Sequence, residues 1–232
     1  MKHIVIVGGS RGIGLAAAKE LAAAGHRLLL VGRDEGHLAD AKAQLPPETL
    51  TLALDASSPA APDALVSFLR EQNFPVDGLV LSAATFSDPA THTSVVKPTA
   101  EELSQMLERN VVTHYRLVQA LLPLVEKQRG RIVVVGSTAG IRRDKGGIYG
   151  ISKWALRSLA YQLRDECKAA GVGVSLVNPG GTFTERRTKK DPGDTTLLET
   201  SDLGKLIALI FELSPQAVIE QVDIRPLGGD TY

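Results

Sequence analysis

Short runs of β-branched and aliphatic residues alternate with longer segments of helical periodicity along this chain. The apolar runs predict seven strands, at residues 3–9, 27–33, 50–56, 77–84, 130–137, 172–181 and 218–226. The segments between them predict helices, at about residues 13–24, 36–45, 63–72, 99–125, 149–170 and 203–214. Strands that alternate with helices build a mostly parallel sheet with helices on both faces. We therefore expect an α/β fold, a single doubly wound domain over residues 1–232.

The composition is that of an ordinary globular protein, with 44% hydrophobic and 22% charged residues. Lysine plus arginine equals aspartate plus glutamate, so the formal net charge is zero. This balance gives no support for binding to nucleic acid or to an anionic membrane. No apolar run approaches the ~20 residues that span a bilayer. The run in "MKHIVIVGG" is too short for a signal peptide. We expect a cytoplasmic protein.

Cysteine and histidine give no sign of a metal site. The only cysteine, Cys167, lies in a helical pattern, so an internal disulfide is impossible and a cysteine-rich metal site is disfavoured. The five histidines are scattered and show no ligand spacing, and we expect no catalytic metal. His114 follows Asn110 by one helical turn, so it either approaches the same site as Asn110 or is a packed or solvated residue.

Two segments depart from the regular pattern. Pro123 lies inside the predicted helix 99–125, and we expect a bend there because the ring removes a backbone donor. Residues 184–202 are polar, basic in their first half, and have neither strand nor helix periodicity. Ligands of open α/β sheets bind beyond the carboxyl ends of strands, where this segment begins. Residues 184–202 are therefore either a lid over a ligand or a surface loop.

The glycine-rich stretch "VGGSRGIG" (7–14) directly follows the first predicted strand and opens the first helix. Its Gly-x-x-x-Gly-x-Gly spacing lets the backbone turn sharply and approach a ligand closely. Amides at the start of the helix, with the positive end of its dipole, favour a phosphate group. A turn without any ligand is the alternative. We assign dinucleotide binding in this stretch to Gly8, Ser10, Arg11, Gly12, Ile13 and Gly14.

The residues at the end of the second strand indicate which nucleotide binds. An acidic residue there would bind the ribose hydroxyls of NAD(H), and an arginine would accommodate the 2′-phosphate of NADP(H). Arg33 stands at this position, and Arg11 lies in the glycine turn nearby, so we favour NADP(H). Asp34 would serve NAD(H) instead if the register moved by one residue.

Tyr149 and Lys153, in "YGISK", are four residues apart and share one face of a helix. An ammonium beside a phenol favours the phenolate and lowers a pKa that otherwise lies near ~10. Such a tyrosine would exchange protons near neutral pH. The alternative is a surface helix with an aromatic side chain and a solvated lysine.

These motifs occur in the order found in the short-chain dehydrogenase/reductase family, which the chain resembles over essentially its whole length. "GSTAG" (136–140) is similar to the family's serine segment, and "YGISKWAL" (149–156) to its active-site helix. "NPGG" (178–181) resembles the Pro-Gly turn beside the nicotinamide. Asn110 resembles the fourth catalytic residue. The resemblance implies a classical Rossmann-type member of the family.

The resemblance also implies a role for each catalytic residue. Tyr149 would be the general acid in carbonyl reduction and the base in alcohol oxidation. Lys153 would lower the pKa of Tyr149 and hold the nicotinamide ribose. Ser137 would donate a hydrogen bond to the substrate oxygen as negative charge develops there. Asn110 would hold a water that links Lys153 to solvent.

Further coenzyme contacts are implied along the carboxyl edge of the sheet. Asp55 would contact the adenine, and Thr184 the carboxamide. The other positions that we assign on this basis are Ala56, Ser82, Ala83, Ala84, Pro179, Gly180 and Thr182. The family usually carries an Asn-Asn-Ala-Gly-like segment after the fourth strand, where this chain has "SAAT" (82–85), so we expect altered support for the coenzyme there.

Structural alternatives exist for three of the implied residues. Asn110 would be an ordinary helix residue bonded to neighbouring backbone, Ser137 would cap a turn, and Asp55 would satisfy loop amides. Each alternative uses the same polar side chain without any ligand. The directions of the Asn110, Ser137 and Asp55 side chains therefore distinguish the catalytic or binding roles from these alternatives.

The sequence predicts an NADP(H)-dependent oxidoreductase acting on a small carbonyl or alcohol. A catalytically silent NADP(H)-binding regulator of the same fold is the alternative. The resemblance suggests a homodimer or homotetramer packed through helices 99–125 and 149–170. The second helix carries an apolar stripe that would serve this interface or pack onto the sheet: Trp154, Leu156, Leu159 and Leu163.

Overall fold

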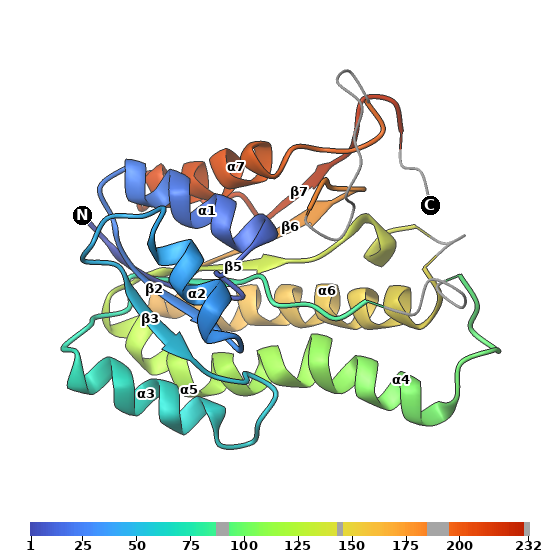
Figure 1. The fold of residues 1–232 in the computed structure, drawn as a ribbon, viewed down its shortest axis with the longest axis horizontal. Coiled ribbons are helices and arrows are strands. Elements are labelled where there is room, and N and C mark those ends of the chain that lie inside the picture. Colours follow the sequence, from blue (N-terminus) through green and yellow to red (C-terminus); the bar gives the residue numbers. More distant parts are fainter. Residues whose placement is uncertain (87–92, 143–145, 185–194, 230–232) are drawn as a thin grey trace.

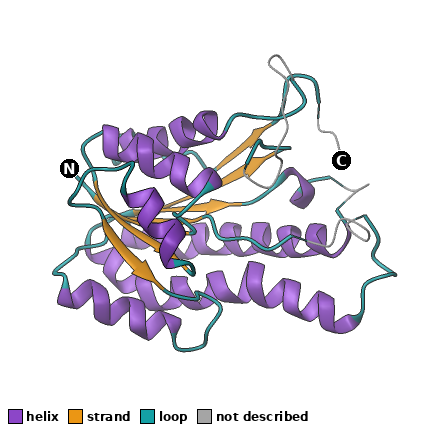
Figure 2. Ribbon diagram, in the orientation of Figure 1, coloured by secondary structure: helices purple, strands orange, loops and turns teal. Residues whose placement is uncertain are grey.

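The computed structural model describes residues 1–86, 93–142, 146–184 and 195–229 (Figures 1 and 2). Its strands are β1 (His3–Val7), β2 (Arg27–Gly32), β3 (Leu50–Ala53), β4 (Gly78–Leu81), β5 (Arg131–Val135), β6 (Gly173–Pro179) and β7 (Gln221–Ile224). They form one sheet in the order β3-β2-β1-β4-β5-β6-β7, and every neighbouring pair is parallel. The predicted doubly wound α/β fold is confirmed.

Helices cover both faces of this sheet (Figure 1). They are α1 (Gly12–Ala23), α2 (Glu35–Lys42), α3 (Ala61–Glu71), α4 (Ala100–Leu107), α5 (Thr113–Lys127), α6 (Gly147–Cys167) and α7 (Thr200–Glu212). Successive residues of a strand point to opposite faces. Val5 and Val7 of β1 therefore pack in the core beneath α3, α5 and α6, whereas Ile4 and Ile6 pack in the core beneath α1, α2 and α7.

The sequence order of the strands reverses at β1, which lies between β2 and β4. Both neighbouring connections leave the carboxyl ends of these strands, so the loops after β1 and β4 meet at this edge. The Ser82 N–H donates to the Val7 carbonyl at 2.9 Å, and the Gly8 N–H donates to the Val31 carbonyl at 2.8 Å. Ligands of open α/β sheets bind at such a reversal. The topology therefore brings the glycine turn to the expected binding edge.

The predicted helix 99–125 is interrupted at a place that the sequence analysis did not indicate. A π-helical segment, η1 (Glu108–Val112), separates α4 from α5, and α5 continues through Pro123 to Lys127. The helix therefore does not end at Pro123, and the expected bend there stays a prediction. The buried face of α5, with Leu117 and Leu121, packs on the sheet around Pro123 and keeps the helix in place. π segments of this kind occur frequently at functional sites.

The apolar stripe of α6 mostly faces the sheet. Leu156 and Leu163 belong to the core, and Leu159 packs against it, which confirms the alternative of packing onto the sheet for these residues. Trp154 is the exception, because 42% of its surface is exposed. Within the described ranges, none of the helices combines the length and apolar character needed to cross a membrane.

Helix α7 packs closely on α1 through Gly204. A Cβ atom at Gly204 would lie 2.6 Å from the carbonyl oxygen of Ala16, and backbone cannot move aside as a side chain can. We predict that Gly204→Ala lowers the free energy of unfolding by about 1–3 kcal/mol, as overpacking typically does. Urea denaturation measures this loss.

Gly36→Ala is the matched control, because Gly36 is an exposed glycine of α2 and a Cβ there would meet only the end of the Asp34 side chain, at 3.3 Å. This variant should be neutral or more stable by up to about 1 kcal/mol, since alanine favours helix over glycine. Equal effects of the two substitutions would show that Gly204 does not set the spacing of α1 and α7.

Candidate active site

The glycine turn lies directly against the loop that follows β4. Gly8 has φ +83°, and a Cβ atom there would lie 2.7 Å from the backbone nitrogen of Ala83, so only glycine fits. The turn and the segment Ser82–Ala84 are therefore brought together as the sequence predicted. Ser10 follows in the turn, and its side chain lies beside Gly32, the last residue of β2.

The start of α1 has the properties of an anion site. Gly12, Ile13 and Gly14 form its first turn, and Arg11 is the residue before it. The Arg11 side chain supplies no capping hydrogen bond, and the first turn contains no acidic residue. Helix amides that lack a side-chain cap, at the positive end of the dipole, suit a phosphate. The residues present therefore fit a dinucleotide phosphate.

Arg33 and Asp34, the two residues after β2, have different surroundings. Arg33 follows the last residue of β2 and is exposed. Asp34 is the N-cap of α2, and its Oδ1 accepts a hydrogen bond from the His37 N–H at 2.7 Å. This bond is the main reason why the pKa of Asp34 is lowered. A carboxylate used as a helix cap is a poorer candidate for binding a ribose than Arg33 is for binding a phosphate.

Asp55 organises the turn after β3. Its Oδ1 accepts hydrogen bonds from the Ser57 N–H at 3.0 Å and from the Ser57 hydroxyl at 2.8 Å. These bonds lower the pKa of Asp55, with smaller contributions from the charges of Arg33 and Arg109. The alternative in which Asp55 satisfies a loop amide is therefore confirmed, while its contact with adenine stays a prediction. The next residue, Ala56, packs against the core.

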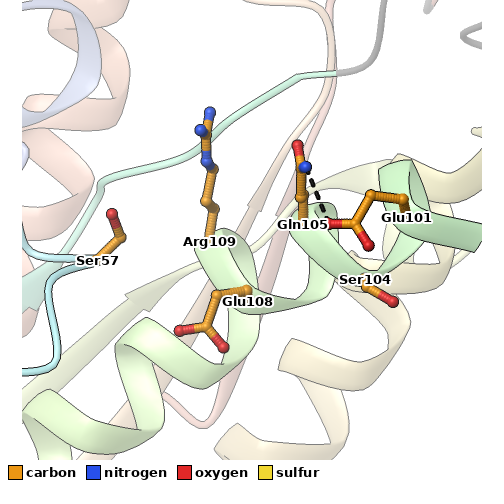
Figure 3. A pocket seen from close by; sticks show the side chains of 6 residues that line it. All are labelled: Ser57, Glu101, Ser104, Gln105, Glu108 and Arg109. Atoms are coloured by element: carbon orange, nitrogen blue, oxygen red, sulfur yellow. Dashed lines mark hydrogen bonds between the residues drawn. The ribbon is translucent and has the colours of Figure 1, made fainter.

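A pocket of about 300 Å³ that is lined by polar and charged residues borders this turn (Figure 3). It lies between the turn after β3 and the α4–η1 helix, from which the Arg109 side chain projects (Figure 3). Its lining residues are Ser57, Glu101, Ser104, Gln105, Glu108 and Arg109. Neither Tyr149 nor Lys153 lines it. The pocket therefore belongs to the Asp55 side of the sheet edge, and the sequence analysis did not single it out.

Lys153 is buried beneath the tyrosine that precedes it by one helical turn. Only 2% of its surface is exposed, and its Nζ donates to the carbonyl of Val135 at the end of β5, at 3.1 Å. The same Nζ lies 5.6 Å from the centroid of the Tyr149 ring. Burial lowers the pKa of Lys153 to about 8, so the side chain still carries its charge at pH 7. The alternative of a solvated lysine is wrong.

Phe86 covers one face of the Tyr149 ring. The two rings are stacked, with centroids 5.0 Å apart and an interplanar angle of 22°. Phe86 is itself 53% exposed, so it places an apolar surface next to the phenol. Phe86 was not predicted from the sequence, because an aromatic residue in a loop carries no periodic signal. Its position just after "SAAT" was the one available indication.

The buried Asn110 side chain joins three parts of the site. Its Oδ1 accepts from the Thr85 N–H at 2.7 Å, and its Nδ2 donates to the Thr85 carbonyl at 2.8 Å. Nδ2 also donates to Ser152 Oγ at 3.1 Å, and the Ser152 hydroxyl donates to the Tyr149 carbonyl at 2.7 Å. Asn110 thus bonds to the backbone of a distant loop rather than of its own helix, and its role toward a water stays a prediction. The π segment η1, in which Asn110 lies, holds it between the β4 loop and α6.

This network explains how the chain tolerates threonine where the family usually has glycine. Asn110 binds only the backbone of Thr85, so the Thr85 side chain does not enter the contact. The altered support that we expect for the coenzyme at "SAAT" therefore consists of a loop that Asn110 holds in place. Ser152, which is completely buried, was missed because a small residue between Tyr149 and Lys153 carries no sequence signal of its own.

Ser137 begins the short helix η2 (Thr138–Gly140), which packs against α6. Its Oγ accepts from the Ala139 N–H at 3.1 Å, so the predicted alternative of a turn cap is confirmed. The hydroxyl proton can still be donated, because a serine hydroxyl is both donor and acceptor. Asn178 of β6 also accepts from the Ser137 N–H at 3.3 Å, a positioning contact that the sequence analysis missed.

The Pro-Gly turn lies at the end of β6, of which Pro179 is the last residue. The Gly180 N–H donates to the Ile224 carbonyl, and the Thr182 hydroxyl donates to the Gly180 carbonyl at 3.0 Å. Thr182 also forms a parallel bridge with Leu198. The two sides of the predicted lid 184–202 are thereby held together. Thr184 is described, residues 185–194 lie outside the described part, and residues 200–202 already belong to α7.

The sequence of this chain matches a known protein family. The model of the short chain dehydrogenase family matches residues 2–195, which is most of the chain. The chain belongs to the short-chain dehydrogenase family. This membership confirms the resemblance found in the sequence and places the chain among oxidoreductases.

Named relatives of this short-chain dehydrogenase support the same conclusion. It is 28% identical over 229 residues to an uncharacterized oxidoreductase of Staphylococcus epidermidis, with 97% of each chain covered. It is 29% identical over 239 residues to the NADP-dependent 3-hydroxy acid dehydrogenase YdfG of Salmonella typhimurium, with 97% of this chain and 94% of the relative covered.

Solved structures of similar fold include complexes with NADP. An alcohol dehydrogenase from the archaeon Thermococcus sibiricus, complexed with 5-hydroxy-NADP, has a TM-score of 0.89 at 24% identity, with 100% of this chain and 99% of that chain covered. A metagenomic short-chain oxidoreductase in complex with NADP has a TM-score of 0.82 at 27% identity, with 97% and 96% covered.

The burial of Lys153 makes the stability of this dehydrogenase depend on pH. A lysine whose pKa falls from 10.5 to about 8 on folding destabilises the folded protein while it is charged, by about 3 kcal/mol below pH 8. Between about pH 8 and 10.5 the unfolded chain binds more protons than the folded one, so this destabilisation disappears as pH rises.

We predict that the free energy of unfolding of the coenzyme-free protein, relative to that of Lys153→Met, increases by about 3 kcal/mol over this pH range. Denaturant titrations at each pH measure the difference. Lys205→Met removes an exposed lysine of α7 and should show no such trend relative to the unmodified protein. A flat difference for Lys153→Met would mean that the lysine is not desolvated.

Proposed function

We propose that this dehydrogenase interconverts a small carbonyl compound and the corresponding alcohol with NADP(H) as coenzyme. The observation that carries the proposal is the buried cation of Lys153, which is fixed on the end of β5 and lies beneath the Tyr149 ring. A cation in this position favours the phenolate over the phenol, which makes the tyrosine a usable proton donor and acceptor.

Each residue of the proposed catalytic set has a distinct task. The bound coenzyme supplies or accepts the hydride. Tyr149 donates a proton to the carbonyl oxygen in reduction and accepts it in oxidation. Ser137 donates a hydrogen bond to that oxygen as its negative charge grows. Asn110 fixes the β4 loop and, through Ser152, the start of α6, so it holds Tyr149 in place.

Three observations support NADP(H) over NAD(H). Arg33 follows β2 and Arg11 precedes α1, so two guanidinium groups lie at the edge where a 2′-phosphate would bind. Asp34 caps α2 and is thereby drawn away from a ribose. In addition, a curated relative is named as NADP-dependent, and similar solved structures are NADP complexes.

The remaining proposed coenzyme contacts follow the same edge of the sheet. Asp55 and Ala56 would border the adenine, and Ser82–Ala84 would lie beneath the coenzyme next to Gly8. Pro179, Gly180, Thr182 and Thr184 would border the nicotinamide, and residues 184–202 would act as the lid. The isolated parallel bridge between Thr182 and Leu198 would give such a lid a fixed base.

The exposed ring of Phe86 beside Tyr149 favours carbonyl substrates with an apolar substituent. An aromatic surface next to the proton donor would bind such a substituent by excluding water. The exposed aromatic residues Tyr115 of α5 and Trp154 of α6 are consistent with a homodimer or homotetramer formed through these helices.

The proposed proton donor is tested by Tyr149→Phe. We expect kcat for NADPH-dependent reduction of ketones, diketones or quinones to fall at least 10²-fold, because general acid catalysis typically contributes about 10²–10⁴-fold. NADPH binding, measured by fluorescence titration, should be retained. Tyr115→Phe is the control, since it removes an exposed phenol of α5 and should leave kcat unchanged.

Near-normal turnover by Tyr149→Phe would refute the assignment of Tyr149 as the proton donor. Tight NADPH binding without turnover of any substrate by the unmodified protein would favour the silent regulator.

The coenzyme preference is tested by Arg33→Ala. We expect kcat/KM for NADPH to fall about tenfold or more, because a charge-assisted hydrogen bond is worth about 1.5–3 kcal/mol, while kcat/KM for NADH changes little. Arg27→Ala removes an exposed arginine from the opposite end of the same strand and should change neither value. A tenfold preference of the unmodified protein for NADH would overturn the assignment of NADP(H).

A further inference from the structure

Asn178 is a buried amide at the end of β6 that lies against the serine segment. Only 1% of its surface is exposed. Its Oδ1 accepts from the Ser137 N–H at 3.3 Å. A Cβ atom at position 136 would lie 2.2 Å from the same oxygen, so Gly136 leaves the space that the amide occupies. The side chain of Asn178 therefore supports the backbone that carries the Ser137 hydroxyl.

Asp223 holds the other end of this amide. Asn178 and Asp223 are in register in the parallel pair of β6 and β7. The Asn178 Nδ2 donates to Asp223 Oδ1 at 2.8 Å, and Gln221 Nε2 donates to the same oxygen, also at 2.8 Å. Asp223 is exposed, whereas its partner Asn178 is buried. A chain of two hydrogen bonds thus joins the last strand to the serine segment.

The chemistry of these two contacts determines which way the amide faces. An asparagine side chain accepts through its oxygen and donates through its nitrogen. A carboxylate only accepts, so Asp223 requires Nδ2, and a backbone N–H only donates, so Ser137 requires Oδ1. A reversed amide would place two donors against each other at Ser137 and two acceptors against each other at Asp223. Asp223 therefore selects the orientation in which Asn178 binds Ser137.

Ser137 is held from two sides as a result. Asn178 binds its backbone N–H, and the Ala139 N–H donates to its Oγ at 3.1 Å. Neither bond uses the hydroxyl proton, which stays available to a substrate oxygen. Such a donor is effective when it is aimed in advance at the position where negative charge develops. The two bonds to Ser137 limit how far this donor can turn.

We propose that Asn178 and Asp223 are positioning residues, which fix the Ser137 hydroxyl toward the substrate oxygen. The inference deepens the proposed function and rests on it for its catalytic consequence. In this role neither residue touches the substrate or exchanges a proton. Asp223 orients the Asn178 amide, the amide holds the backbone of Ser137, and this backbone sets the direction of the hydroxyl.

A purely structural role of this pair makes a different prediction. If Asp223 only fastened β7 to β6, its loss would lower the melting temperature and leave kcat unchanged. Asp223→Ala removes the acceptor, whereas Asp223→Asn keeps an acceptor oxygen for the Asn178 amide. Gln221→Leu is the matched control, because it removes the other donor to Asp223 Oδ1 and leaves the bond to Asn178 in place.

The first test measures hydrogen exchange of two neighbouring backbone amides by NMR on the coenzyme-free protein. We expect the Ser137 N–H to exchange about tenfold faster in Asp223→Ala than in the unmodified protein, as for one weakened hydrogen bond. The Gly136 N–H is the internal reference, since it donates to the Val177 carbonyl at 2.7 Å and should keep its rate. This readout does not depend on activity. An unchanged rate for the Ser137 N–H would overturn the inference.

The second test compares kcat, KM for NADPH and the melting temperature of the variants. We expect Asp223→Ala to lose about tenfold in kcat, as for one lost hydrogen bond, with an unchanged KM for NADPH. Asp223→Asn and Gln221→Leu should stay within about twofold of the unmodified protein. An unchanged kcat in Asp223→Ala, or an equal loss in Asp223→Asn, would overturn the positioning role.

A double-variant comparison shows whether the effect passes through the Ser137 hydroxyl. In a Ser137→Ala background, Asp223→Ala should change kcat by no more than about twofold, because the group that it aims is absent. A full tenfold further loss in that background would overturn the inference. If the unmodified protein shows no turnover while Asp223→Ala accelerates exchange of the Ser137 N–H, the proposed function fails and the support of Ser137 by Asp223 stands.

Discussion

The hydrogen bond between the buried ammonium of Lys153 and the carbonyl of Val135 is the interaction on which the candidate site depends. A charged group is rarely buried without a partner, because desolvation opposes its charge. Here the partner is the end of a central strand, so the cation has a fixed position in the sheet. The helical spacing of Tyr149 and Lys153 then fixes the phenol over that cation. The fold therefore determines the geometry of the proton donor.

A second constraint links this centre to the coenzyme edge. Asn110 lies in the π-helical interruption between α4 and α5, and its amide binds the backbone of Thr85 on one side and Ser152 on the other. The loop that it holds also carries Ala83, which lies against Gly8 of the glycine turn. The phosphate-binding turn, the loop after β4 and the helix with Tyr149 are thus parts of one connected packing arrangement. A change at any of the three would be transmitted to the others.

The sequence predicted the fold and most of the polar residues that the structure brings to this edge. The strand and helix periodicities were sufficient for the parallel sheet, because buried strands and amphipathic helices differ clearly in pattern. The glycine turn and the Tyr149–Lys153 pair depend on local spacing, which a sequence states directly. The capping roles of Asp55 and Ser137 were among the alternatives for the same reason, since their partners lie two residues away.

Other features depend on contacts between distant segments and could not be read in advance. The π segment at Asn110 has no composition of its own, and the tolerance of α5 for Pro123 follows from its packing on the sheet. The stacking of Phe86 on Tyr149 and the hydrogen bond between Asn178 and Asp223 exist only in the folded chain. The most direct test of the buried cation is the pKa of the Lys153 ammonium, measured by NMR on the coenzyme-free protein with labelled lysine. A pKa of about 8 is expected, and a value near the ordinary 10.5 would contradict the buried cation on which the proposed chemistry rests.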